Sequence, residues 1–157
     1  PARTGAPTLT RFYDDFRVGE VIELGSLMVS ESEIIAFARQ YDPQPMHVDP
    51  NSASFTIHGG LIPSGWHTGS PFLRLLVPTL ISNTSSMGSP GMEDLRWPLP
   101  VRPGDTLSAQ IEVLEMRVSN SRPSMGIVRW RGEVRNQEGR LVMSATGTNF
   151  FGRRPST

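Results

Sequence analysis

A carboxylate and an imidazole lie five residues apart in this chain, as Asp42 and His47 of the segment YDPQPMHVDP. The prolines of this segment restrict the backbone around both side chains. An acid and an imidazole held in fixed positions can share a water molecule or a proton, as general acid–base chemistry requires. The alternative is a structural turn in which Asp42 caps a neighbouring amide and His47 has no chemical role. The spacing leaves both interpretations open.

A glycine-rich segment, HGGLIPSGWHT at residues 58–68, leads directly into an apolar stretch. If that stretch is a helix, the amides at its N-terminus carry partial positive charge. Glycines have no side chain to keep a ligand oxygen away from such amides, so the segment suits a developing oxyanion. An ordinary glycine turn is the alternative.

All three histidines of the chain, His47, His58 and His67, lie between residues 47 and 67. Their spacings do not resemble HExxH or the other paired patterns of zinc sites, so we expect neither a metal nor another cofactor. The chain has no cysteine, which excludes disulfides, thiolate metal sites and a cysteine nucleophile. Taken singly, His58 and His67 are more simply interpreted as packed or surface residues.

The length of 157 residues is that of one domain and allows one sizeable core. Lys plus Arg and Asp plus Glu both number 15, so the formal net charge is zero. A chain without a net field is not expected to have nucleic acid or an anionic membrane as its main partner. The sequence has no apolar run of membrane-spanning length and no signal-peptide stretch near its start, so we expect a cytoplasmic protein.

Two helices are predicted. Ser30 and Glu33 form a capping box that begins the first, and this helix stops at Asp42 because Pro43 follows. Residues 42–60 contain three prolines and are expected to be irregular. The second helix, near 65–80, is apolar around much of its girth, which predicts a buried helix. Pro71 inside it predicts either a kink or a regular part that starts near Ser70.

Five strands are predicted around these helices. One covers residues 21–29, with an interruption near Gly25, and four follow the second helix at about 86–97, 106–118, 126–136 and 140–151. Consecutive strands joined by short turns imply antiparallel pairing. The result is an α+β protein, a curved antiparallel sheet wrapped around a long central helix, which is the form of the hot-dog fold. We expect a tail at 1–11, one domain at 12–152 and a tail at 153–157.

Three segments together resemble the MaoC-like dehydratases, also called R-specific enoyl-CoA hydratases. The first is DPQPMHVD at residues 42–49, which is similar to the family pattern of Asp, any residue, Asn or Gln, Pro, an apolar residue, His, any residue and Asp. The second is GGLIPSGWHT at 59–68, and the third lies within 95–107, from LRW to PVRPGDTL. With the order of elements, the resemblance covers about residues 12–151.

This resemblance implies reversible hydration of a 2-enoyl thioester to the 3-hydroxyacyl thioester, with R preference. Asp42 and His47 would be the acid–base pair. We expect them to hold one water molecule, with Asp42 passing the proton. The amide of Gly59 or of Gly60 would lie in the oxyanion hole. The resemblance and the neighbouring sequence assign three further residues to the substrate pocket: Ser64, Trp66 and His67.

Two other functions remain open from the sequence. A hot-dog thioesterase would use a carboxylate to direct water at the thioester carbon instead of at C3. A non-catalytic module would bind an acyl thioester without turning it over. In each case the expected partner is an acyl thioester of CoA or of acyl carrier protein. Because a sheet with free edges invites pairing with a second copy, we expect a homodimer or a higher homo-oligomer.

Overall fold

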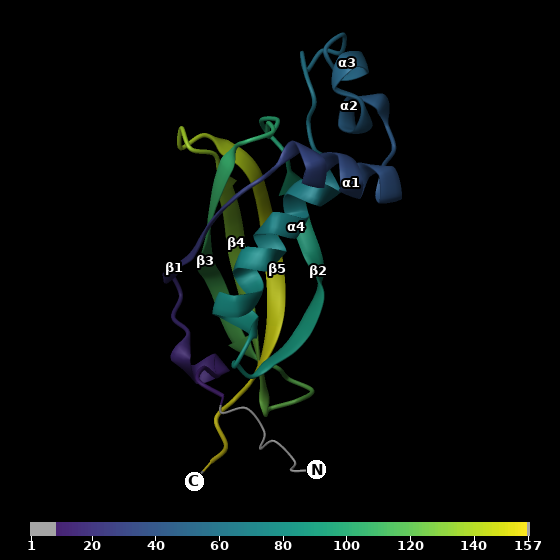
Figure 1. The fold of residues 1–157 in the computed structure, drawn as a ribbon. Coiled ribbons are helices and arrows are strands. Elements are labelled where there is room, and N and C mark those ends of the chain that lie inside the picture. Colours follow the sequence, from purple (N-terminus) through teal and green to yellow (C-terminus); the bar gives the residue numbers. More distant parts are fainter. Residues whose placement is uncertain (1–8, 157) are drawn as a thin grey trace, which may run out of the picture.

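The computed structural model describes residues 9–156, and these form a five-stranded antiparallel sheet with helices on one face (Figure 1). The strands are β1 (Val21–Met28), β2 (Ser86–Arg96), β3 (Thr106–Val118), β4 (Met125–Arg135) and β5 (Leu141–Gly152). The long helix α4 (Gly65–Leu76) runs along the sheet, as Figure 1 shows. The predicted α+β architecture, a sheet around a central helix, is confirmed.

The order of strands across the sheet is β1-β3-β4-β5-β2. The expectation that consecutive strands pair holds for β3, β4 and β5, but it is wrong for β2, which pairs with β5 instead of β3. The connection from β2 to β3 contains Pro98, Pro100 and Pro103, which prevent a tight hairpin there. A register shift between Glu23 and Gly25 confirms the predicted interruption of β1.

Helix α1 (Glu31–Tyr41) begins and ends as predicted. The Ser30 hydroxyl accepts from the Glu33 amide at 3.2 Å, and the Glu33 carboxylate accepts from the Ser30 amide at 3.1 Å. Asp42 is the C-terminal cap, and its amide bonds the Ala38 carbonyl at 2.8 Å. The local sequence therefore delivers Asp42 to the end of α1.

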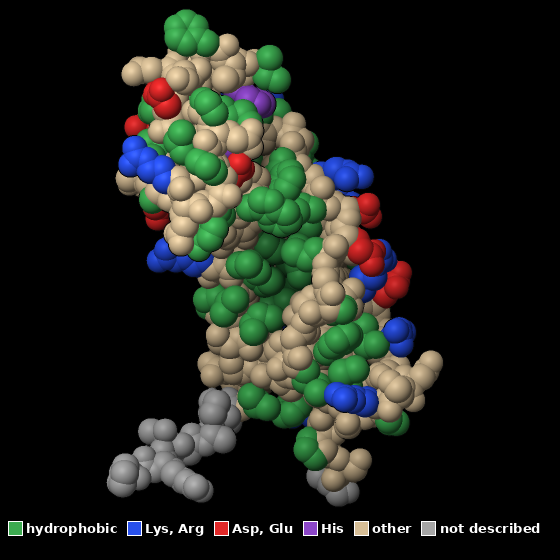
Figure 2. Space-filling model, turned by 90° about the vertical axis from the view of Figure 1, so that its right-hand side faces the viewer, with side chains coloured by type: hydrophobic (Ala, Val, Ile, Leu, Met, Phe, Trp, Pro, Cys, Tyr) green, Lys and Arg blue, Asp and Glu red, His purple; other side chains and the backbone are tan. Residues whose placement is uncertain are grey.

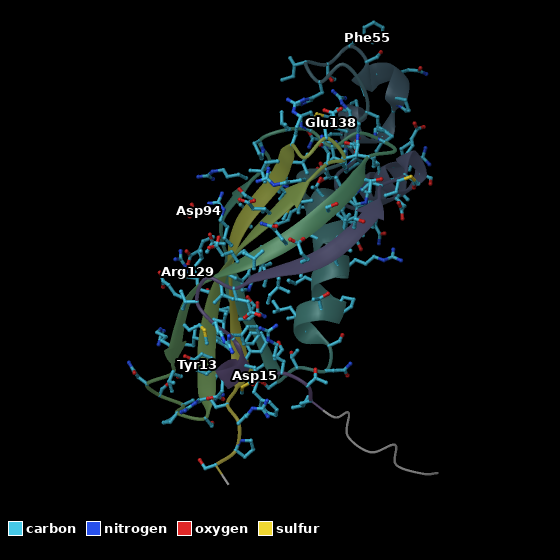
Figure 3. All side chains as sticks on the ribbon, turned by 90° about the vertical axis from the view of Figure 1, so that its left-hand side faces the viewer. Tyr13, Asp15, Phe55, Asp94, Arg129 and Glu138 are labelled. Atoms are coloured by element: carbon cyan, nitrogen blue, oxygen red, sulfur yellow. The ribbon has the colours of Figure 1, made fainter. Side chains whose placement is uncertain are left out.

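The segment after α1 is less irregular than expected, because it contains two single helical turns, α2 (Pro45–Val48) and α3 (Pro50–Ala53). A proline opens each turn, and proline is favoured at the first helical position. The chain beyond α3 projects from one end of the molecule, where Phe55 points into solvent, far from Tyr13 and Asp15 (Figure 3).

Helix α4 is continuous from Gly65, so a regular start near Ser70 is wrong. Pro71 lies inside the helix, where the neighbouring Phe72 packs on Trp130 of β4 with ring centroids 5.8 Å apart. Tertiary packing of this kind offsets the missing proline N–H. The π-helical turn η2 (Val77–Ile81) extends the helix.

The expectation of a helix buried around its girth is only partly correct. Phe72 and Leu76 are buried against the sheet, but Trp66 and Leu73 are 68% and 51% exposed. The side of the molecule on which α4 and β2 lie presents a band of hydrophobic side chains (Figure 2). The exposed members on these elements and directly after them are Trp66, Leu73, Val77, Met87, Met92 and Trp97.

Residues at both ends of the described chain are tied to the domain. The Thr10 amide bonds the Asn83 carbonyl at 2.6 Å, and the Arg154 guanidinium contacts the Asp15 carboxylate at 2.8 Å. The expected tails at 1–11 and 153–157 are therefore anchored at these positions, while residues 1–8 and 157 lie outside the described part. None of the helices in residues 9–156 has the length and apolar character that crossing a bilayer requires.

Candidate active site

A pocket of about 460 Å³ lies where α1, α2 and the start of α4 meet the connection from β2 to β3. It brings together the two residues that the sequence singled out, Asp42 and His47. The lining residues are Asp42, Gln44, Met46, His47, His58, Ile62, Pro63, Ser64, Gly65, Trp66, Thr68, Trp97, Pro98, Leu99, Pro100 and Val101.

His47 is buried in α2, and both of its ring nitrogens face a polar group. Nδ1 lies 2.7 Å from the Ile62 carbonyl oxygen. Because a carbonyl only accepts, Nδ1 carries the proton of this bond. Nε2 lies 3.5 Å from Oδ2 of Asp42. In the neutral imidazole, Nε2 therefore presents its lone pair toward the carboxylate.

Asp42 is only partly buried, with 25% of its side chain exposed. Its Oδ1 accepts from Nε2 of Gln44 at 2.7 Å. This hydrogen bond is the main cause that lowers the pKa of Asp42, with further lowering by the Ser64 hydroxyl and by His47. The carboxyl is therefore ionised at neutral pH and acts as an acceptor.

The start of α4 supplies amide donors to the same pocket. The helical hydrogen-bond ladder begins with the Thr68 amide, which bonds the Ser64 carbonyl at 3.1 Å. The preceding amides, including that of Gly65, have no partner within the helix. A Cβ at Gly65 would lie 2.7 Å from the ring of Trp97, so any other residue there requires the ring or the helix start to shift. Gly65 lines the pocket that also holds Asp42 and His47, so its amide is a candidate donor there.

The structure does not bring Gly59 and Gly60 into this pocket. The Gly59 amide already donates to the Thr56 carbonyl at 3.0 Å, within a turn where Gly59 has a φ of 65°. Gly60 lies beside Arg102, whose guanidinium donates to the His58 carbonyl. Sequence reasoning did not single out Gly65, which lines the pocket. In the sequence, the signal that could have pointed to Gly65 is the Ser-Gly pair at the start of the apolar helix.

Of the three predicted pocket residues, Ser64 and Trp66 line the pocket and His67 does not. Ser64 is fully buried, and Trp66 meets Trp97 edge to face at 6.0 Å. His67 points to the other side of α4, where it stacks on Phe37 of α1 at 5.0 Å. Burial lowers the pKa of His67. Its place is between the two helices.

In the part of the chain that the structure covers, no cluster of three or more His, Asp or Glu side chains is arranged to hold a metal ion. The groups available for chemistry in the pocket are the Asp42 carboxylate, the His47 imidazole and the main-chain donor at Gly65. Together they can polarise a carbonyl oxygen and transfer a proton nearby.

Comparisons with known proteins show the family of the chain and its fold. The model of the family described as "MaoC like domain" matches residues 15–130. The MaoC-like dehydratase from Rhodospirillum rubrum is similar in structure, with 37% identity and a TM-score of 0.86, over 94% of this chain and 100% of that one. The R-hydratase PhaJ1 from Pseudomonas aeruginosa is similar with 26% identity and a TM-score of 0.74, over 91% and 86%.

Two relatives by sequence cover less of the chain. The uncharacterized protein YdeM from Bacillus subtilis is 34% identical over 102 residues, which are 65% of this chain and 72% of that protein. Mesaconyl-CoA hydratase from Haloarcula hispanica is 38% identical over 65 residues, which are 41% of this chain. That match spans only 18% of the length of the hydratase.

Proposed function

We propose that this chain, which belongs to the MaoC-like domain family, reversibly adds water across the double bond of a 2-enoyl thioester. The product is the 3-hydroxyacyl thioester, and the carrier is CoA or acyl carrier protein. The similarity to an R-hydratase supports R stereochemistry, and the similarity to mesaconyl-CoA hydratase supports a thioester substrate.

The observation that carries the proposal is the pairing of two acceptors. Nε2 of His47 and Oδ2 of Asp42 lie 3.5 Å apart. When His47 is neutral with its proton on Nδ1 and Asp42 is ionised, both atoms are acceptors and neither can donate to the other. A water molecule beside them satisfies both, because it donates one O–H to each. Its oxygen then presents a lone pair toward the pocket. Such a water is a nucleophile held in place by a base.

The amide of Gly65 supports the other half of the reaction. A thioester carbonyl conjugated to the double bond makes C3 electrophilic, and attack at C3 moves charge onto the carbonyl oxygen. A main-chain N–H directed at that oxygen contributes roughly 2.7–4 kcal/mol in well-studied enzymes. Gly65 lines the same pocket as the acid–base pair, so one bound thioester can meet both groups.

The proposed step conserves atoms and charge. The water oxygen bonds to C3 as its proton passes to Asp42, and the electron pair of the double bond moves onto the thioester oxygen as an enolate. The enolate then collapses as Asp42 returns the proton to C2. Because the pKa of Asp42 is lowered, the protonated carboxyl is a strong acid toward C2. His47 keeps the water oriented through Nε2.

A homodimer is part of this proposal. Among residues 9–156, strand β2 pairs only with β5, so its other edge has no partner strand there. Apolar side chains gather on the face where α4 and β2 lie (Figure 2). Two of the exposed ones, Trp66 and Trp97, also line the pocket. Pairing two copies along β2 covers this surface. Light scattering measures the mass directly, and a monomer at working concentration contradicts this part.

The function is tested with crotonyl, longer and branched enoyl thioesters of CoA. We expect loss of the enoyl absorbance without release of free thiol. Asp42→Ala and His47→Ala, each shown to fold by circular dichroism, should lower the rate by at least about a hundredfold. Glu138→Ala is the matched control, since this exposed carboxylate in the β4–β5 turn does not line the pocket.

Three outcomes overturn the assignment. Near-normal turnover by Asp42→Ala or His47→Ala shows that these two residues are not the acid–base pair. Release of thiol at the rate of enoyl loss identifies a thioesterase. Saturable thioester binding without any turnover identifies a non-catalytic module.

A further inference from the structure

We propose that the hydroxyl of Ser64 donates a hydrogen bond to the Asp42 carboxylate during the reaction, which makes Ser64 a positioning residue. This inference rests on the proposed function, because it assigns a role within the same pocket. It is carried by the burial of Ser64, by the absence of a cap bond, and by the position of Asp42.

The Ser64 side chain is fully buried, and its Oγ has no hydrogen-bond partner among residues 9–156. Buried hydroxyls are nearly always hydrogen-bonded, because an unpartnered one loses its interactions with water and gains nothing. Ser64 also lines the pocket that holds Asp42 and His47. The spare donor is therefore in reach of whatever occupies this pocket.

Ser64 stands at the N-cap of α4 but does not cap the helix. A serine at this position ordinarily accepts from an amide of the first turn. Here that bond is missing, so the first-turn amides remain free for a thioester oxygen and the hydroxyl remains free for a different partner. An N-cap serine that leaves its own helix uncapped fits a role in the pocket better than a role in stability.

Asp42 is the charged acceptor of the pocket. Its Oδ1 accepts from Gln44 and its Oδ2 faces His47, but a carboxylate has about four acceptor positions in total. The Ser64 hydroxyl lies near enough to lower the pKa of Asp42, although it makes no bond of normal geometry there. We expect the Ser64 hydroxyl to complete this contact during the reaction.

The backbone holds Ser64 at this place. The Ile62 amide bonds the Met46 carbonyl at 3.1 Å, and the Ile62 carbonyl accepts from His47. These two bonds fasten the segment before Ser64 to α2. The titratable side chains that line the pocket around Ser64 are Asp42, His47 and His58.

A donor at Ser64 has two effects on Asp42. It fixes the carboxylate so that one oxygen stays directed at the water. It also stabilises the ionised form, so that a proton taken from water is readily given to C2. Removal of the hydroxyl should therefore slow the proton transfers while thioester binding is retained.

The test is Ser64→Ala. We expect kcat to fall roughly ten- to hundredfold, the loss of one hydrogen bond to a charged group, with little change in KM. The acidic limb of the kcat–pH profile should move to higher pH. Ser64→Cys keeps a weak donor, so its kcat should lie between the kcat of the wild type and that of Ser64→Ala. Ser85→Ala is the control. It removes a buried hydroxyl outside the pocket, which donates to the Gly152 carbonyl at 2.9 Å.

An NMR titration of the Asp42 carboxyl carbon tests the contact without any assay of turnover. The Asp42 pKa should be higher in Ser64→Ala than in the wild type and unchanged in Ser85→Ala. An unchanged Asp42 titration in a folded Ser64→Ala protein overturns this inference. If wild-type protein fails to hydrate any enoyl thioester while the titration shifts as expected, the proposed function fails and the contact stands.

Discussion

The imidazole of His47 donates through Nδ1 to the main-chain carbonyl of Ile62 at 2.7 Å. This bond joins α2 to the segment that leads into α4, and it decides which nitrogen of His47 faces Asp42. The same bond therefore links the proposed acid–base pair to the segment that carries Gly65, the proposed oxyanion donor.

Gly65→Ala should abolish hydration, whereas Gly69→Ala should not. A Cβ at Gly65 would meet the Trp97 ring at 2.7 Å, which displaces either the ring or the helix start that carries the proposed donor. A Cβ at Gly69, in the same helix, meets nothing within 4 Å and should raise stability by about 0.5–1 kcal/mol. Rates of enoyl loss and urea denaturation measure both effects. Equal activity in the two variants would show that Gly65 is not the oxyanion donor.

Gly59→Ala distinguishes the two candidate oxyanion sites. The φ of 65° at Gly59 strains an alanine by roughly 1–2 kcal/mol, but its amide is already bonded to Thr56. We expect a less stable protein with nearly normal kcat. A loss of kcat as large as that of Gly65→Ala would return the oxyanion hole to the Gly59–Gly60 turn.

Gln44→Leu should shift the acidic limb of the activity profile upward. In the folded protein the pKa of Asp42 lies below its ordinary value of 3.8, and the Gln44 hydrogen bond is the largest cause. Activity needs the ionised carboxylate, so it is lost as the pH falls through this pKa. Without the amide, that loss occurs at higher pH, nearer the ordinary value.

Gln137→Leu is the matched control for this shift. It removes an amide that donates to the Asp105 carboxylate at 2.9 Å, outside the pocket. The acidic limb of the activity–pH profile of Gln137→Leu should stay at the wild-type pH. Protein held at each pH and returned to neutral buffer must regain full activity, which separates titration from unfolding.

His67→Phe should make stability less dependent on pH. Burial lowers the pKa of His67 below its ordinary value of 6.5, while Glu33 opposes this shift. The unfolded chain then binds more protons than the folded one, so wild-type stability falls as the pH drops below about 6.5. A phenylalanine keeps the stack on Phe37 and cannot be protonated. Urea denaturation near pH 7 and near pH 5 gives the free energy of unfolding at each pH. An equal change in this free energy between the two pH values in wild type and variant contradicts the prediction.

Local patterns in the sequence predicted most of the fold. The Ser30–Glu33 capping box fixed the start of α1, and the proline after Asp42 fixed its end. Strand β3 covers the predicted residues 106–118, because its alternation of apolar and polar side chains is regular. These signals act between near neighbours, so they can be read without the tertiary structure.

The partner of β2 could not be read in this way. Its pairing with β5 joins residues far apart in the chain, such as Ser86 and Phe151. The burial of α4 was overestimated for a related reason, because an apolar side chain such as Leu73 looks the same in sequence whether it faces the sheet or the surface.

The candidate site was predicted in part. Asp42 and His47 were found because they lie close together in the sequence and on one loop. Gly65 was not singled out because its close approach to the Trp97 ring joins segments that are distant in the sequence. The Gly59–Gly60 pair gave a stronger local signal, although the turn at Thr56 occupies its first amide.

The central claim is that water adds to C3 of a thioester that stays intact. It is tested most directly by turnover of crotonyl-CoA in oxygen-18 water, with mass spectrometry of the product. Our account predicts one labelled oxygen in the C3 hydroxyl of a product that still carries CoA, and none with Asp42→Ala. Label in the carboxylate of a free acid, with an equal amount of free thiol, would contradict it.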